Sequence, residues 1–195
     1  VTYNGNAVEG ATVGHGLTYK PSLIIVKGLG YSYDWIVYHK DVSPNILALN
    51  SANSMAPSQE QFNETEPDST VFTVGVSPGG TNRTSDHIAY CWAETPGVSS
   101  FGTYAGTNAV HTIDCGFEPA FVMIKCTTSG NDWIIQDSVR GPGVLYPDLS
   151  NAENAGGYIS LTSTGFSLDV ASGLSNSNGD TYIYAAFAGS YDIDV

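Results

Sequence analysis

Four aromatic residues are the best candidates for binding chemistry in this sequence of 195 residues. Tyr31 and Tyr33 lie in a loop that begins with glycine, and Trp35 and Trp133 each follow an aspartate at the start of an apolar segment. Exposed aromatic rings offer large apolar faces with a polar edge, which suits contact with a sugar or a protein. We therefore take these four residues as candidate ligand-binding residues.

Each candidate also has a structural interpretation. Trp35 and Trp133 alternate with Val37 and Ile135 along predicted strands, which is typical of core residues, so a sugar-stacking platform is the functional alternative for the two tryptophans. Tyr31 and Tyr33 occur in one half of the sequence only, which favours a contact role, but packing onto a neighbouring loop is the structural alternative.

Four charged residues have simpler structural interpretations. We expect Asp137 and Arg140 to form a local ion pair or to hold a turn. Lys27 and Lys125 end two apolar segments, and we expect each to keep its ammonium group in water.

Sequence patterns of catalytic and metal sites are absent. The chain has no G-x-S-x-G, no H-E-x-x-H and no phosphate-binding Gly-Lys loop, and its four histidines lack metal-ligand spacing. Residues 176–180 resemble a calcium loop only loosely, and Asn178-Gly179 favours a hairpin turn there. The sequence therefore predicts no catalytic residue, no metal and no cofactor, with a glycosidase-type pair of carboxylates brought together by folding as the enzymatic alternative.

Charge and hydropathy limit the classes of partner that the protein can bind. Six Lys and Arg residues against 19 Asp and Glu residues give a net charge of −13, which disfavours nucleic acid and anionic membrane surfaces. The longest apolar runs, residues 23–26 and 182–188, are far shorter than a membrane span of about 20 residues. A start at Val1 indicates a processed, truncated or partial chain. Three cysteines argue against a disulfide framework, although one long-range disulfide stays open.

The sequence contains two copies of one unit. Four blocks recur in the same order and at nearly the same spacing: residues 21–27 and 34–37 recur 98 residues later, residues 69–73 recur 94 later, and residues 88–93 recur 95 later. Both copies are rich in short β-branched and aromatic runs separated by Gly, Asn, Ser and Pro. No long segment has the 3.6-residue apolar period of a helix.

This pattern predicts an all-β protein with almost no helix. We expect two tandem homologous units of β-sandwich or jelly-roll type, residues 1–97 and residues 98–195, with the join near residues 94–100. Two packed units are favoured over a single sandwich made from two intertwined halves.

The second copy resembles a repeated β-domain of tail-fibre and other virion structural proteins in tailed bacteriophages, including marine and cyanobacterial phages. The similar segments are G-F-E-P at 116–119, W-I-I-Q-D-S-V-R-G at 133–141, a Leu-Ser-Asn turn at 149–151, G-F at 165–166 and N-G at 178–179. The first copy departs from this pattern at three positions, where His39, Val42 and Ser43 replace Asp137, Arg140 and Gly141.

The resemblance implies a virion structural protein on the exterior of the phage particle. We expect a tail-fibre or tail-tip module that contributes to attachment to host-surface glycan, is not an enzyme, and assembles with other virion proteins and as a homo-oligomer, with a trimer as the usual form of a fibre. A capsid decoration or head-fibre protein is the alternative, and a polysaccharide-degrading tail spike is the third interpretation.

Overall fold

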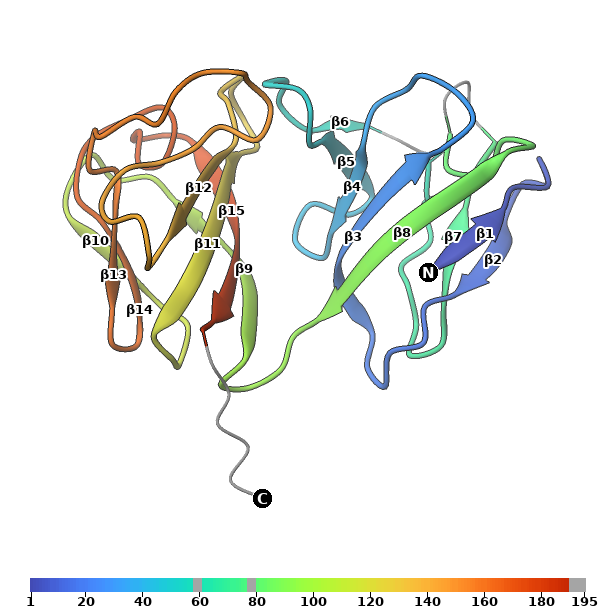
Figure 1. The fold of residues 1–195 in the computed structure, drawn as a ribbon, viewed down its shortest axis with the longest axis horizontal. Coiled ribbons are helices and arrows are strands. Elements are labelled where there is room, and N and C mark those ends of the chain that lie inside the picture. Colours follow the sequence, from blue (N-terminus) through green and yellow to red (C-terminus); the bar gives the residue numbers. More distant parts are fainter. Residues whose placement is uncertain (58–60, 77–79, 190–195) are drawn as a thin grey trace. The chain divides into compact units, whose positions relative to one another are not determined.

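The computed structural model describes residues 1–57, 61–76 and 80–189, and these residues form strands, turns and loops without a helix (Figure 1). The predicted all-β, sandwich-like class is confirmed. The chain divides into two compact units, unit 1 (residues 1–51 and 55–93) and unit 2 (residues 52–54 and 94–195). The division falls at Ala93/Glu94, a few residues before the expected boundary, where β8, the last strand of unit 1, ends.

The described residues of unit 1 form eight strands in two sheets. The larger sheet has the order β1-β8-β3-β4-β5-β6, and β2 pairs with β7 in the second sheet. The strands are β1 (Thr2–Asn4), β2 (Ala11–Gly14), β3 (Pro21–Gly28), β4 (Ile36–His39), β5 (Asn45–Ala48), β6 (Ala56–Pro57), β7 (Val71–Val74) and β8 (Asp86–Ala93). Side chains from both sheets form one core, including Ile24 and Val26 of β3 and Phe72 and Val74 of β7.

The described residues of unit 2 repeat this arrangement with four strands in the larger sheet, which lacks counterparts of β5 and β6, and three strands in the smaller sheet. The larger sheet has the order β12-β11-β15-β9 and the smaller has the order β10-β14-β13. The strands are β9 (Ser99–Ala105), β10 (His111–Asp114), β11 (Pro119–Cys126), β12 (Ile134–Asp137), β13 (Ile159–Thr162), β14 (Gly165–Leu168) and β15 (Thr181–Ala188). The core again lies between the sheets and includes Val122 and Ile124 of β11 and Phe166 of β14.

Strand registers show that the two units are copies. In unit 1, Pro21 pairs with Ala93 and Leu23 with Trp92, with a register shift between Pro21 and Leu23. In unit 2, Pro119 pairs with Ala188 and Phe121 with Phe187, with the same shift. A proline at the first residue of a strand donates no ladder hydrogen bond, which suits this irregular start. The sequence duplication is therefore also a structural duplication.

A buried asparagine joins two segments of unit 1. Asn82 is 2% exposed, and its Oδ1 accepts a hydrogen bond from the Asn6 backbone N–H at 2.9 Å. Its Nδ2 donates to the Val8 carbonyl at 2.8 Å. Ala7, between these two partners, has a positive φ of 53°, a conformation that costs a non-glycine residue energy and needs support from its surroundings. The Asn82 side chain thus holds the segment after β1 in a tight turn.

Unit 2 has the same arrangement around Asn176, which is fully buried. Its Oδ1 accepts from the Thr107 backbone N–H, and its Nδ2 donates to the Ala109 carbonyl, both at 2.8 Å. Asn108 between them has a positive φ of 59°. The segment that resembled a calcium loop in the sequence is therefore part of this structural turn.

Glycine is required just before each of these turns. A Cβ on Gly5 would lie 1.8 Å from the Arg83 carbonyl oxygen, and a Cβ on Gly106 would lie 2.1 Å from the Ser177 carbonyl oxygen. Both distances are far below van der Waals contact, and the obstructing atoms belong to the backbone. The close approach of the two segments therefore depends on glycine in both units.

The three cysteines, Cys91, Cys115 and Cys126, are all free thiols. Burial raises the pKa of the Cys91 and Cys115 thiols to about 11.

Among the described residues, no helix has the length and apolar character needed to cross a membrane.

We predict that Asn176→Ala destabilises unit 2 by about 2–4 kcal/mol, because the substitution removes the acceptor of the Thr107 backbone N–H and one of the two donors to the Ala109 carbonyl. Urea unfolding followed by circular dichroism measures the change. Asn178→Ala, two residues later and exposed, is the matched control and should have almost no effect. Equal unfolding midpoints for the two variants would show that the buried amide is dispensable.

Candidate functional site

Strand β8 directs aromatic side chains away from the core of unit 1. Along β8, Ala89 and Cys91 face the core, and Tyr90 and Trp92 therefore face the opposite side, because successive side chains of a strand alternate. Tyr90 pairs with Ile25 of β3, and Trp92 pairs with Leu23. Figure 1 shows β8 beside β3 in the larger sheet.

Trp35, Tyr90 and Trp92 form a row of nearly parallel rings, which we call the aromatic row. The Tyr90 and Trp92 ring centroids are 6.2 Å apart with an angle of 17° between the planes. The Trp35 and Tyr90 centroids are 6.4 Å apart at 25°. Tyr90 is 42% exposed, and the two tryptophans are half-buried. The row thus combines fixed ring geometry with accessible apolar surface.

Backbone and side-chain hydrogen bonds hold Trp35 in place before strand β4. Its backbone N–H donates to Asn50 Oδ1 at 2.9 Å, and Asn50 Nδ2 donates to Asp34 Oδ1 at 2.9 Å. The Lys27 ammonium lies 5.8 Å from the centroid of the Trp35 ring and donates to the Tyr33 carbonyl. A cation over an indole face is attracted by the ring quadrupole, so Lys27 restrains the edge of the row.

The described part of unit 2 has no row of parallel rings. Phe187, the counterpart of Trp92, instead packs against Phe101 at an interplanar angle of 85° and against Phe121 at 59°. The residue that pairs with Met123, as Tyr90 pairs with Ile25, is Ala185, so the central ring is missing. Trp133, which precedes β12 as Trp35 precedes β4, is only 1% exposed. The structure therefore gives the two candidate tryptophans different environments: Trp35 is half-buried in the row, and Trp133 is buried.

Lys125 corrects one expectation from the sequence. Its side chain is fully buried rather than kept in water, and Nζ donates to the carbonyls of Asn131 at 2.5 Å and Ala52 at 2.9 Å. Burial lowers the pKa of Lys125, since desolvation disfavours the charged form. The carbonyl oxygens replace the water that the sequence-based expectation assumed.

Tyr31 packs inside unit 1. Its hydroxyl oxygen lies 2.9 Å from both the Gly80 carbonyl and His87 Nε2, and the Arg83 guanidinium lies over its ring at 4.6 Å. A Cβ on Gly28 would lie 2.4 Å from a Tyr31 ring atom, so the ring covers a position that only glycine can occupy. These contacts favour the packing interpretation for Tyr31, whereas Tyr33 is 40% exposed.

His87 lies at the centre of the contacts around Tyr31. The imidazole is fully buried, stacks on the Tyr3 ring at 5.0 Å, and donates from Nδ1 to the Ser85 carbonyl at 2.8 Å. Burial lowers the pKa of His87, so the neutral form predominates in the folded unit at neutral pH. In unit 2 the matching residue is Tyr182, which stacks on Tyr104 at 5.2 Å.

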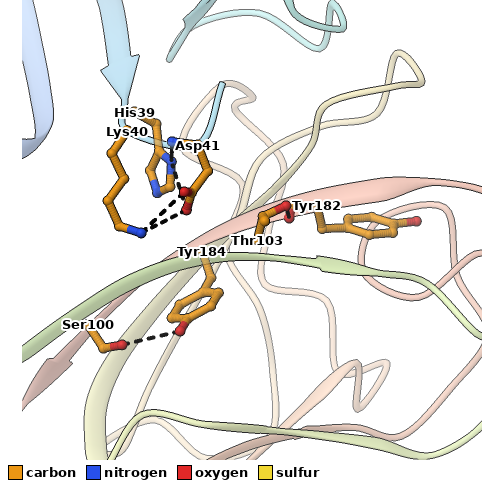
Figure 2. A network of polar contacts seen from close by, with 7 residues as sticks. All are labelled: His39, Lys40, Asp41, Ser100, Thr103, Tyr182 and Tyr184. Atoms are coloured by element: carbon orange, nitrogen blue, oxygen red, sulfur yellow. Dashed lines mark hydrogen bonds and ion pairs between the residues drawn. The ribbon is translucent and has the colours of Figure 1, made fainter. Parts of the chain in front are cut away.

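In the turns after β4 and β12, different side chains accept hydrogen bonds from the backbone N–H groups of the turn. Lys40 pairs with Asp41 in unit 1, where His39 Nδ1 accepts the Asp41 backbone N–H at 3.2 Å (Figure 2). In unit 2, Asp137 accepts the backbone N–H groups of Val139 and Arg140 at 3.0 Å each. Arg140 also forms an ion pair with Asp137, which confirms the expected pair. The backbone hydrogen bonds and the contact with the Arg140 side chain lower the pKa of the Asp137 carboxyl.

Other polar side chains stabilise the sheets. Figure 2 also shows Ser100 of β9 beside Tyr184 of β15, and the two hydroxyl oxygens lie 3.2 Å apart. The Thr103 hydroxyl of β9 donates to the Tyr182 carbonyl at 2.9 Å. In the part of the chain that the structure describes, no three His, Cys, Asp or Glu side chains are grouped so that they could hold a metal ion.

A pocket of about 340 Å³ lies beside strands β1 and β2 of unit 1. Its lining includes Asn6, Asn82 and Tyr3, whose polar groups already form hydrogen bonds within the unit. The pocket lacks the row of parallel rings, so we place the candidate site at the aromatic row.

Sequence reasoning missed Tyr90 and Trp92. Both lie in the block at 88–93 that recurs at 183–188, and a shared block suggests shared core. The available signal was the alternation along β8 combined with the difference between Tyr90 and its counterpart Ala185.

Fold and site define this chain as a duplicated all-β protein in which unit 1 carries a row of nearly parallel aromatic rings. The chain belongs to the family described as Domain of unknown function (DUF7483), whose profile matches residues 1–190 and so spans both units. No curated protein and no solved structure matches the chain.

We predict that acidification weakens unit 1 more than unit 2. His87 has a lowered pKa in the folded unit, so the unfolded chain binds the proton more readily, and the stability that neutral His87 supports is lost as the pH falls below the ordinary histidine range. Hydrogen-exchange protection factors of β8 should fall relative to those of β15 between pH 7.5 and 5.5. His87→Phe should remove this difference. Parallel loss in both strands would contradict the prediction.

Proposed function

We propose that this protein is a structural module of a bacteriophage virion, in a tail fibre or tail tip, and that it binds host-surface glycan without turnover. The sequence resemblance to phage virion domains supports the virion assignment. A rigid, duplicated β scaffold with few charged residues supports a mechanical and adhesive role. The aromatic row supplies a surface for the apolar faces of sugar rings.

The observation that carries the binding role is the restriction of the aromatic row to unit 1. Features shared by both units are explained by the shared fold, as the buried asparagines are. Tyr90, in contrast, occupies a position where the same fold accepts Ala185, so the fold itself does not require an aromatic ring there. An exposed ring that the fold does not need is a reasonable contact residue.

Assembly would compensate for weak individual sites. A single row of rings on a flat sheet gives modest affinity for a sugar. Several copies of the chain in one fibre raise the effective concentration of sites at the host surface, so weak contacts combine into firm attachment.

We predict that Tyr90→Ala weakens glycan binding by about tenfold or more, which corresponds to about 1.4 kcal/mol, and leaves the fold intact. Unit 2 already has alanine at this position. The measurement is binding of the full chain to a printed array of bacterial surface glycans, followed by titration with the retained glycan. Tyr19→Ala, which removes another exposed tyrosine of unit 1, is the control.

Two results would contradict the binding role. The first is failure of the unmodified chain to retain any glycan on the array. The second is retention that Tyr90→Ala and Tyr19→Ala leave equally strong. Release of reducing ends from a retained polysaccharide would replace binding without turnover by a polysaccharide-degrading activity.

We predict that gold-labelled antibodies against this chain decorate the tail of the phage that encodes it, as seen by electron microscopy of whole particles. Label over the head would replace the tail-fibre assignment by a capsid decoration or head-fibre protein. Particles without label, from a lysate in which the chain is detected, would refute the virion assignment altogether.

A further inference from the structure

The six cations of the chain have three kinds of partner. Three of them form ion pairs with carboxylates, and one is buried against carbonyl oxygens. The remaining two lie over aromatic rings and, among the described residues, pair with no carboxylate. The ion-paired cations are Lys20, Lys40 and Arg140, the buried cation is Lys125, and the two cations over aromatic rings are Lys27 and Arg83.

Lys27 and Arg83 are fixed to the same segment of unit 1, residues 28–35. The Lys27 ammonium contacts the Tyr33 carbonyl and lies 5.8 Å from the centroid of the Trp35 ring. The Arg83 guanidinium lies 4.6 Å from the centroid of the Tyr31 ring, and Arg83 is exposed. Gly28 pairs with His87, whose side chain lies on the core side of the sheet with Ala89 and Cys91, so the Tyr31 ring over Gly28 holds Arg83 on that side. Lys27 alone therefore lies beside the aromatic row.

The nearest carboxylates in the sequence use amides as partners. Asp34 Oδ1 accepts a hydrogen bond from Asn50 Nδ2, and Asp86 Oδ1 accepts one from Asn4 Nδ2, each at 2.9 Å. Among the described residues, neither Lys27 nor Arg83 pairs with a carboxylate, although the sequence has 19 carboxylates and only 6 Lys and Arg cations. Their remaining N–H donors are available to an external anion, and charge-assisted hydrogen bonds of this kind are strong.

Unit 2 lacks both features. Lys125, the counterpart of Lys27, is buried and donates to two carbonyl oxygens. Ser177, whose carbonyl faces Gly106 as that of Arg83 faces Gly5, stands in the place of Arg83. The cations thus distinguish the same unit that carries the aromatic row.

We propose that Lys27 selects an acidic glycan, one with a carboxylate or phosphate group, whose sugar rings rest on the aromatic row. This inference rests on the proposed glycan-binding function. The net charge of −13 does not prevent such binding, because at physiological salt the Debye length is about 8 Å, so distant carboxylates are screened while direct contacts are not. The Lys27 ammonium contributes a compact point charge beside the Trp35 ring.

The test compares acidic and neutral forms of the same sugar. Oligogalacturonate and its methyl ester differ in charge but share the sugar ring, and phosphomannan and mannan distinguish a phosphate from a carboxylate source. Binding of the full chain to each probe is measured by affinity electrophoresis and titration calorimetry at low and physiological salt. We expect at least one acidic probe to bind about tenfold more tightly than its neutral counterpart.

One variant assigns this preference to Lys27. Lys27→Met keeps an unbranched apolar side chain over Trp35 but removes the charge. It should reduce the preference for the acidic probe severalfold while leaving binding of the neutral probe nearly unchanged. Lys20→Met, which removes a cation that already pairs with Glu66, is the control and should keep the preference.

The outcomes separate this inference from the proposed function. Equal binding of acidic and neutral probes, weakened by Tyr90→Ala, would overturn the selection of acidic glycan and retain the aromatic row as the binding site. A preference that survives Lys27→Met would also overturn it. Failure of every probe to bind, together with a blank array, would overturn the proposed function itself.

Discussion

The buried amides of Asn82 and Asn176 are the constraint on which the rest of each unit depends. A buried amide must satisfy its donor and its acceptor, and each of these does so by joining the segment after the first strand to the segment before the last strand. The first and last strands are thereby held in register, and the Tyr3–His87 and Tyr104–Tyr182 stacks occupy the same place. A slip of one residue would turn every side chain of the strand to the other face. The outward direction of Tyr90 thus follows from this register.

The sequence predicted the central strands and the duplication because apolar runs mark strands that are buried. It did not indicate β9, β10, β1 or β2 as strands, since these edge strands are short of apolar residues and are defined by their pairing with β15, β14, β8 and β7. The burial of Lys125 was unpredictable for a related reason. Lys27 and Lys125 end similar strands, and only the Ala52 carbonyl, far away in sequence, gives Lys125 its second partner.

The candidate site was only partly predictable, because a sequence block shared by both copies does not show which of its residues are exposed. Trp35 was identified from its residue type, whereas Tyr90 lies in the recurring block at 88–93 and was not singled out. The positions do correspond, since Tyr90 and Ala185 pair with Ile25 and Met123 in the same register. Their residue types differ. Because this position lies on the outward face of the strand, the difference changes the surface and not the core. Tyr31 shows the reverse case: it differs from its counterpart Ser129, yet its contacts with Gly80 and His87 lie inside the unit.

Duplication explains how one fold can keep a stable core in both units while the outer faces of the units differ. Each copy needs the same glycines, buried asparagine and core strands, so those positions cannot change without loss of stability. The faces of the sheets that point away from the cores are less constrained, and there the copies have diverged: Trp133 and Lys125 are buried in unit 2, whereas Trp35 and Lys27 lie together, half-buried, in unit 1. The same two residue types, at the same two positions, therefore act as structural elements in one unit and form an accessible cation–aromatic pair in the other.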